Sequence, residues 1–238
     1  MPRSAFDKPE RNRLKRLILV VIFLLLASAA PATEISPEEL ERWFESDDFA
    51  PPRALPGSGE LSFIEPRPQA GLHHHSNILT IVPASLRDGW VRMEQCHANM
   101  DAVGRVEIVF RAGRVRELEV TRSEKIGRAW VEGSSVQLED VAEGARVCVR
   151  AWTRALRIND DGSFTLYNGP YMRRFLDGYF PMHVSAEISF AGTGLKFVAI
   201  TPLPQPGFEV VRKDEALSYD AWFEGRLVTE IHFSPDIL

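Results

Sequence analysis

Residues 105–120, RVEIVFRAGRVRELEV, indicate the fold class because apolar and charged side chains alternate along them. Val106, Ile108 and Phe110 occupy every second position, and a second apolar series begins after the turn-forming pair Ala112-Gly113. Successive side chains of a strand point to opposite faces, so this two-residue period indicates half-buried strands. A short glycine-containing turn between two such strands indicates an antiparallel hairpin.

The same pattern of short alternating runs separated by turn residues continues through the body of the chain. Parallel strands need long crossover connections, usually helices, which the pattern lacks. We therefore predict an all-β fold, an antiparallel β-sandwich that is immunoglobulin-like or larger. One segment, with Pro near its start and Gly at its end, predicts a short helical connection near 170–177. The further candidate strands are 78–82, 90–97, 128–132, 135–141, 146–158, 164–167, 184–190, 196–201, 208–211, 216–223 and 226–233.

The first 32 residues have the composition of a secretory signal. Four basic residues within positions 11–16 lie immediately before the apolar run Leu17–Leu26, and two Ala-x-Ala cleavage sites follow it. The apolar segment 17–30 is 14 residues long, shorter than the roughly 20 residues of a membrane-spanning helix. Two outcomes are open: cleavage after Ala32, or retention of residues 17–32 as an anchor that makes the only membrane contact. In both cases the rest of the chain lies in the periplasm or an equivalent extracytoplasmic space.

Beyond the signal, we predict an acidic, Pro-rich stalk over residues 33–69 and a β-sandwich domain over residues 70–238. Within the stalk, Ser36-Pro37 is followed by two glutamates, which is a strong helix start. Apolar residues at i, i+3 and i+4 spacing come next. The stalk therefore predicts a short amphipathic helix over residues 37–46.

The charge distribution argues against nucleic acid as a partner. Residues 1–32 hold six of the chain's 28 basic and two of its 33 acidic residues, which leaves a net charge of −9 for the rest. The stalk has nine acidic and three basic residues, so the body from residue 70 carries only −3. Nucleic acids and anionic lipid head groups both require clustered Lys and Arg, and this nearly neutral body has no such stripe.

The chain has two cysteines, Cys96 and Cys148, 52 positions apart. In an oxidising compartment such a pair usually forms a disulfide, which we expect here. The two Cα atoms must then lie within about 7 Å of each other. Two alternatives are open: a pair of buried free thiols, or Cys96 as a metal ligand beside His97.

The run His73-His74-His75 has the clearest ligand chemistry in the sequence. Neutral imidazole binds zinc, copper, nickel and iron. In a strand only His73 and His75 can converge, because His74 points to the other face. A copper or zinc site would need a third donor, and a structural role for the imidazoles at a sheet edge, or a pH-responsive interface, is the competing interpretation. The candidate third donors are His97, which we favour, and His183, His232, Cys96 or a carboxylate.

Arg173 and Arg174 form a second candidate site, flanked by Tyr171 and Tyr179. Guanidinium groups bind carboxylates and phosphates in a bidentate manner and stack on aromatic rings. These four side chains are therefore a candidate surface for a ligand or partner. The interpretation we favour is plainer: a short helical plug whose aromatic rings close one end of the sandwich core.

The sequence contains no recognisable catalytic signature. It has no Gly-x-Ser-x-Gly elbow, no phosphate-binding glycine loop and no His-Glu-x-x-His zinc motif. We therefore expect an exported, non-enzymatic domain that binds a protein partner or small ligand at the outer face of the cytoplasmic membrane. The alternative function is a periplasmic transition-metal-binding or metalloenzyme-accessory protein that uses the His73–His75 cluster.

Overall fold

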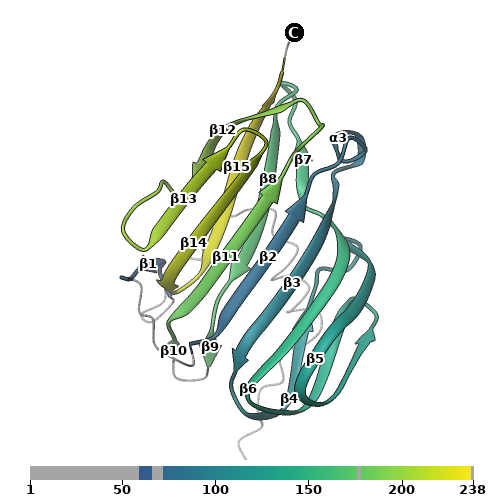
Figure 1. Ribbon diagram of the computed structural model, residues 1–238, viewed down its shortest axis with the longest axis vertical. Helices are drawn as coiled ribbons and strands as arrows, with labels where there is room; N and C mark the ends of the chain where they lie inside the picture. The colour runs from purple at the N-terminus through teal and green to yellow at the C-terminus, as the bar shows by residue number, and fades with distance from the viewer. Residues whose placement is uncertain (1–58, 66–71, 176–177, 237–238) are drawn as a thin grey trace, which may run out of the picture. The chain divides into compact units, whose positions relative to one another are not determined.

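The described part of the chain, residues 59–65, 72–175 and 178–236 of the computed structural model, forms two β-sheets around a hydrophobic core. Figure 1 shows the four-stranded sheet behind one face of the nine-stranded sheet. The predicted class, an all-β sandwich, is therefore confirmed. Within the described residues, no helix is long and apolar enough to cross a membrane.

The elements fall into three groups and one helical turn. The larger sheet contains β1 (Ser62–Phe63), β2 (His74–Thr80), β3 (Trp90–Met100), β4 (Val103–Val109), β5 (Val115–Glu132), β6 (Ser135–Arg154), β11 (Met182–Ser189), β13 (Phe208–Lys213) and β14 (Ala216–Glu224). The smaller sheet contains β7 (Leu156–Ile158), β8 (Phe164–Tyr171), β12 (Leu195–Thr201) and β15 (Leu227–Pro235). A separate hairpin joins β9 (Arg174–Phe175) to β10 (Gly178–Tyr179), and α3 (Ser85–Asp88) is a single helical turn.

One strand pair of the larger sheet is parallel. The sheet has the order β1-β14-β11-β2-β3-β6-β4, with β13 beside β14 and β5 beside β6, and the smaller sheet has the order β12-β15-β8-β7. β2 and β11 run parallel, which corrects the expectation of purely antiparallel pairing. The long crossover that parallel strands require is supplied by the intervening strands β3–β10 instead of by a helix.

Strands β4 and β5 contain the alternating pattern of residues 105–120, but the predicted hairpin between them is wrong. Both strands pair with β6 over its first half, so they lie along its two opposite edges. At one end of β6 Phe110 N donates to Ser134 O (3.0 Å), and at the other Arg154 N donates to Arg114 O (3.0 Å). The five residues 110–114 reach at most about 18 Å, so β6, 20 residues long, curves back on itself. Register shifts along the β5–β6 pair supply the bulges that permit this curvature.

The predicted helical connection near 170–177 is also wrong for the residues described there. β8 continues to Tyr171, and the segment that follows forms the β9–β10 hairpin. Pro170 is tolerated in β8 because β7 pairs only with the first residues of that strand. This end of β8 therefore has one open edge, where a residue without an N–H group costs no ladder hydrogen bond.

The predicted signal and the predicted helix over residues 37–46 lie outside the described residues. Of the predicted stalk, residues 59–65 are described, and part of them joins the larger sheet. β1 pairs with the end of β14, where Ser62 lies opposite Glu224. The Phe63 ring stacks on Phe208 with a centroid separation of 5.2 Å.

Candidate functional site

Two neighbouring strands of the larger sheet change from apolar to polar along the same inner face. On β2, His75 and Asn77 are buried at alternate positions, in line with the buried Leu79. On β3, His97 lies directly opposite His75, and Gln95 lies directly opposite Asn77. Opposite residues of an antiparallel pair share a face, so these four side chains form one polar block toward the smaller sheet.

The smaller sheet meets this block with polar side chains of its own. Asn77 Nδ2 donates to Asn168 Oδ1 and to Tyr171 OH, both at 2.9 Å. Asn168 Nδ2 donates in turn to Tyr219 OH at 2.8 Å. The Tyr219 hydroxyl lies 3.2 Å from Thr229 Oγ1, and Thr229 pairs with Asn168 between β15 and β8. A hydrogen-bonded chain therefore links the two sheets through the centre of the sandwich.

This network is incompletely satisfied. His75 Nε2 and Asn77 Oδ1 are buried and have no hydrogen-bond partner. An unsatisfied buried polar atom costs about 1–3 kcal/mol, whereas apolar side chains of similar shape cost nothing of this kind. Burial also raises the pKa of the Tyr219 hydroxyl to about 12, so this group stays protonated and able to donate. Because buried polar groups carry such a cost, this region is the candidate functional site.

The histidines lie at the outer end of the block. His73 Nε2 is 3.2 Å from His97 Nδ1, and the His75 ring contacts the His97 ring edge-to-face with centroids 4.4 Å apart. The Gln95 amide lies 2.8 Å from His97 Nε2, on the other side of the His97 ring. On its other side, the His75 ring contacts the Tyr171 ring at 4.6 Å. Together, His73, His75 and His97 form what we call the histidine trio.

Burial keeps the histidine trio neutral. Desolvation is the main cause in all three cases: it lowers the pKa of His97 to about 3 and that of His73 to about 4, and holds the pKa of His75 well below its ordinary value. Repulsion from neighbouring imidazoles acts in the same direction on the pKa values of His75 and His97. At neutral pH each ring therefore has an uncharged nitrogen lone pair available as a hydrogen-bond acceptor or a metal ligand.

An ion pair lies beside the trio at the rim of the sandwich. Both Asp101 carboxylate oxygens accept hydrogen bonds from Arg173 Nη2 at 2.8 Å. The Arg173 charge lowers the pKa of His73, and the Asp101 charge raises it, although burial has the larger effect. His73 and His97 keep some exposed surface, whereas Gln95 and Asn77 deeper in the block are buried. His73 thus marks the end of the block that lies nearest to solvent.

The second predicted site, made of four side chains, does not form one surface. Tyr171 is buried in the polar network, with 6% of its surface exposed. Arg173 pairs with Asp101 at the rim, while Arg174 is exposed and lies over the Tyr179 ring at 5.6 Å. The structure thus divides these residues between the interior network and the β9–β10 hairpin, and a partner surface there stays a prediction.

The histidines outside the trio face elsewhere. His74 points to the outer face of the larger sheet, as the alternation predicts, and stacks on His183 with centroids 4.1 Å apart. His183 also contacts Asp220 and stacks on Trp222. His232 lies 3.2 Å from Thr165 on the smaller sheet. Among the predicted third donors, His97 is thus the imidazole in ring contact with both His73 and His75.

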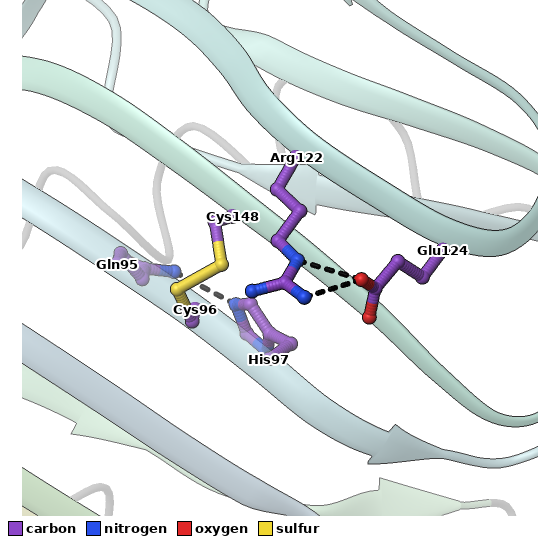
Figure 2. Close-up of a disulfide and its surroundings, with 6 residues drawn as sticks. All are labelled: Gln95, Cys96, His97, Arg122, Glu124 and Cys148. Atoms are coloured by element: carbon purple, nitrogen blue, oxygen red, sulfur yellow. Dashed lines mark hydrogen bonds and ion pairs between the residues drawn. A yellow bond between two sulfur atoms is a disulfide. The ribbon is translucent and has the colours of Figure 1, made fainter.

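The disulfide lies next to the trio on the opposite face of β3. Cys96 and Cys148 are bonded, with Cα atoms 4.1 Å apart, which confirms the predicted pairing. The alternatives of free thiols or a Cys96 metal ligand are thereby wrong. Figure 2 shows Gln95 and His97 on either side of Cys96, joined by their hydrogen bond, with Cys148 on the neighbouring β6. The bond fixes β3 to β6 at the level of the trio.

The trio is not arranged around a common point. Within residues 59–65, 72–175 and 178–236, no group of three or more His, Cys, Asp or Glu side chains has the geometry to hold a metal ion. A separate, open depression of about 600 Å³ lies on β4, β5 and β6. It is lined by Arg105, Val106, Glu107, Glu132, Ser135 and Gln137, far in sequence from the trio and without buried imidazoles.

Reasoning from the sequence missed the amides and hydroxyls that complete the block. The sequence did not single out four of these residues, because polar residues in strands are usually on the solvent face. They are Gln95, Asn77, Asn168 and Thr229. A signal was nevertheless present on β2 and β3. Along the inner face of each strand, starting from the end that is buried in the apolar core, two apolar residues are followed by an amide and then by a histidine. Two such strands side by side predict a polar patch in the core.

Comparisons with known proteins add little. No protein-family model matches the chain, and no curated protein matches its sequence. Among solved structures, an M1 zinc metallopeptidase mutant from Deinococcus radiodurans, bound to a Tyr-Ser-Ala substrate, resembles it with 11% identity and a TM-score of 0.37. That match covers 69% of this chain and 42% of the other. A two-domain M1 zinc metallopeptidase mutant bound to L-tryptophan has 12% identity, a TM-score of 0.34, and coverage of 70% and 43%. The chain thus spans less than half of these proteins, and likenesses this weak carry no argument.

Proposed function

We propose that the protein is an exported, non-enzymatic β-sandwich that binds a small ligand in the polar block between its two sheets. The observation that carries the proposal is the block itself: His75, His97, Asn77 and Gln95 occupy adjacent inner positions of the larger sheet. Asn168 faces them from the smaller sheet. A scaffold needing only stability would fill these positions with apolar side chains, as it does one row deeper.

A small ligand fits this arrangement better than a protein partner. The polar atoms face inward, and His75 and Asn77 have exposed fractions of only 5% and 4%. A protein surface would reach only the rim, where His73 and the Asp101–Arg173 pair lie. A ligand small enough to pass His73 would meet the unsatisfied nitrogen of His75 and satisfy it.

Two features support action outside the cytoplasm. The basic segment, apolar run and Ala-x-Ala sites of residues 1–32 are those of an export signal. The Cys96–Cys148 disulfide is typical of an oxidising compartment. We place the protein in the periplasm or at the outer face of the cytoplasmic membrane, free or anchored through residues 17–32.

The test is ligand-dependent stabilisation of the full chain, produced with its own N-terminal segment in a bacterial host. Thermal unfolding is followed with Zn²⁺, Cu²⁺, inorganic phosphate or citrate, and native mass spectrometry reports any molecule retained through purification. A probe at about 100 times its Kd stabilises by about 2.7 kcal/mol, which raises the Tm by roughly 5–10 °C for a domain of this size.

The variant His73→Leu blocks the rim, and His74→Leu, at the next position and on the outer face of the sheet, is its matched control. We expect at least one probe or retained molecule to stabilise the wild type and His74→Leu but not His73→Leu. The proposal is overturned if nothing is retained and no probe raises the Tm, or if His73→Leu is stabilised as much as the wild type.

A further inference from the structure

We infer that the ligand is a transition-metal ion of the zinc or copper type, held by His73, His75 and His97; this inference rests on the proposed function. Imidazole nitrogen is a preferred ligand for these two metals. Ca²⁺ and Mg²⁺ instead take carboxylate and carbonyl oxygens, and the trio contains no carboxylate. Thiolate ligation is ruled out because both cysteines of the chain are in the disulfide.

The spacing of the first two donors fits a metal. His73 Nε2 and His97 Nδ1 lie 3.2 Å apart. Two nitrogens bound to one tetrahedral zinc at about 2.0–2.1 Å are separated by about 3.3 Å. The apo protein fills this gap with a single proton shared as a hydrogen bond between the two rings. A metal ion bound to both nitrogens would lie off the line that joins them, so each ring would turn by about 35° to aim its lone pair at the ion.

The third donor is already adjacent but must turn. His75 lies opposite His97 on the neighbouring strand, and its Nε2 atom is buried without a hydrogen-bond partner. Because the three donors do not yet enclose one point, binding requires His75 to rotate about its side-chain torsions toward the other two rings. The rotation breaks no hydrogen bond at Nε2, and the bond to the metal would satisfy this atom.

The surroundings of His97 also suit a ligand. In metal sites the non-ligating ring nitrogen is usually fixed by a hydrogen bond to an acceptor. The Gln95 amide nitrogen lies 2.8 Å from His97 Nε2, and turning the amide by 180° places its oxygen there to accept the Nε2–H. That tautomer leaves Nδ1, the atom that faces His73, without a proton.

The charges at the rim neither prevent nor drive cation binding. Arg173 opposes a cation beside His73, and Asp101 favours one, but the two are joined by two hydrogen bonds and form a neutral pair. A neutral imidazole carries one N–H, so the proton that the ion displaces from between His73 and His97 moves to the other nitrogen of one of these rings.

The experiment is titration of the metal-free full chain with Zn²⁺ by isothermal calorimetry, with Co²⁺ absorption as a second readout of coordination. We expect one Zn²⁺ per chain with micromolar or tighter affinity, and visible Co²⁺ bands typical of four-coordination. His97→Gln removes the central donor and should weaken Zn²⁺ binding at least 100-fold, whereas the outer-face control His74→Gln should change it less than threefold.

The inference is overturned if Zn²⁺ and Cu²⁺ bind no tighter than millimolar, or if His97→Gln binds as the wild type does. The two proposals fail separately. If phosphate, citrate or a retained molecule stabilises the protein in a His73-dependent manner while metals do not bind, only the metal assignment falls. If no probe stabilises the protein and nothing is retained, the ligand site itself falls.

Discussion

Lowering the pH from 7.5 to 5.5 should destabilise the metal-free protein through the histidine trio. The folded chain holds His73 and His97 with pKa values of about 4 and about 3, and His75 well below its ordinary value. The unfolded chain binds protons at these rings with the usual pKa of about 6.5. Because the unfolded state takes up more protons, stability is complete above about pH 6.5 and falls as the pH drops below it.

The size of the effect is insensitive to the folded-state pKa values while these lie well below 5.5. Between pH 7.5 and 5.5, one ring that protonates only in the unfolded chain costs about 1.4 kcal/mol, and three rings cost about 4 kcal/mol. This is a large part of the 5–15 kcal/mol by which typical domains are stable. His74 shifts in the same direction but is half-buried and is left out of this sum.

The assay is urea unfolding at both pH values in the presence of EDTA, which removes any metal contribution. His97→Gln deletes one titrating ring while keeping a polar side chain, so its loss of stability should be smaller than that of the wild type by about 1.4 kcal/mol. A wild-type loss below about 1 kcal/mol, or an equal loss in His97→Gln, would refute the claim that these imidazoles are held neutral.

Three further predictions concern other parts of the account. Asn168→Ala removes the acceptor and donor that join the two sheets, and should cost about 2–4 kcal/mol by urea unfolding; a cost below about 1 kcal/mol would mean that the network adds nothing to stability. The double substitution of Cys96 and Cys148 by Ser opens a loop that spans 52 positions, for which chain entropy predicts a loss of up to about 4 kcal/mol; an unchanged urea midpoint would contradict this. Mass spectrometry of protein from the periplasmic fraction should give a chain that begins at Thr33, whereas an intact N-terminus found only in detergent extracts would show that the segment is an anchor.

The alternation of side chains predicted the fold class but not the pairing of the strands. The pattern in residues 105–120 marked both β4 and β5 correctly. Their partner could not be found locally, because the strand between them, β6, begins beyond Glu132 and pairs with both. The parallel β2–β11 pair joins segments about 100 residues apart in the same way. The pairing of strands that are distant in sequence depends on the packing of the whole core, so it cannot be predicted from a short stretch of sequence.

The candidate site was half predictable. Period-two geometry placed His73 and His75 on one face and His74 on the other, and the structure agrees. The choice of His97 from several third donors had no geometric basis in the sequence, because it depends on the β2–β3 register. The contribution of Asn168 could not be predicted from the sequence, because this residue lies on the other sheet.

The most direct test of the metal assignment is an anomalous difference map from crystals of the full chain grown with Zn²⁺ and recorded at the zinc absorption edge. The account predicts a peak between the two sheets, about 2 Å from His73 Nε2 and His97 Nδ1, with the His75 ring turned toward it. A fully ordered trio with no peak, or zinc found only at the outer-face pair His74 and His183, would contradict it.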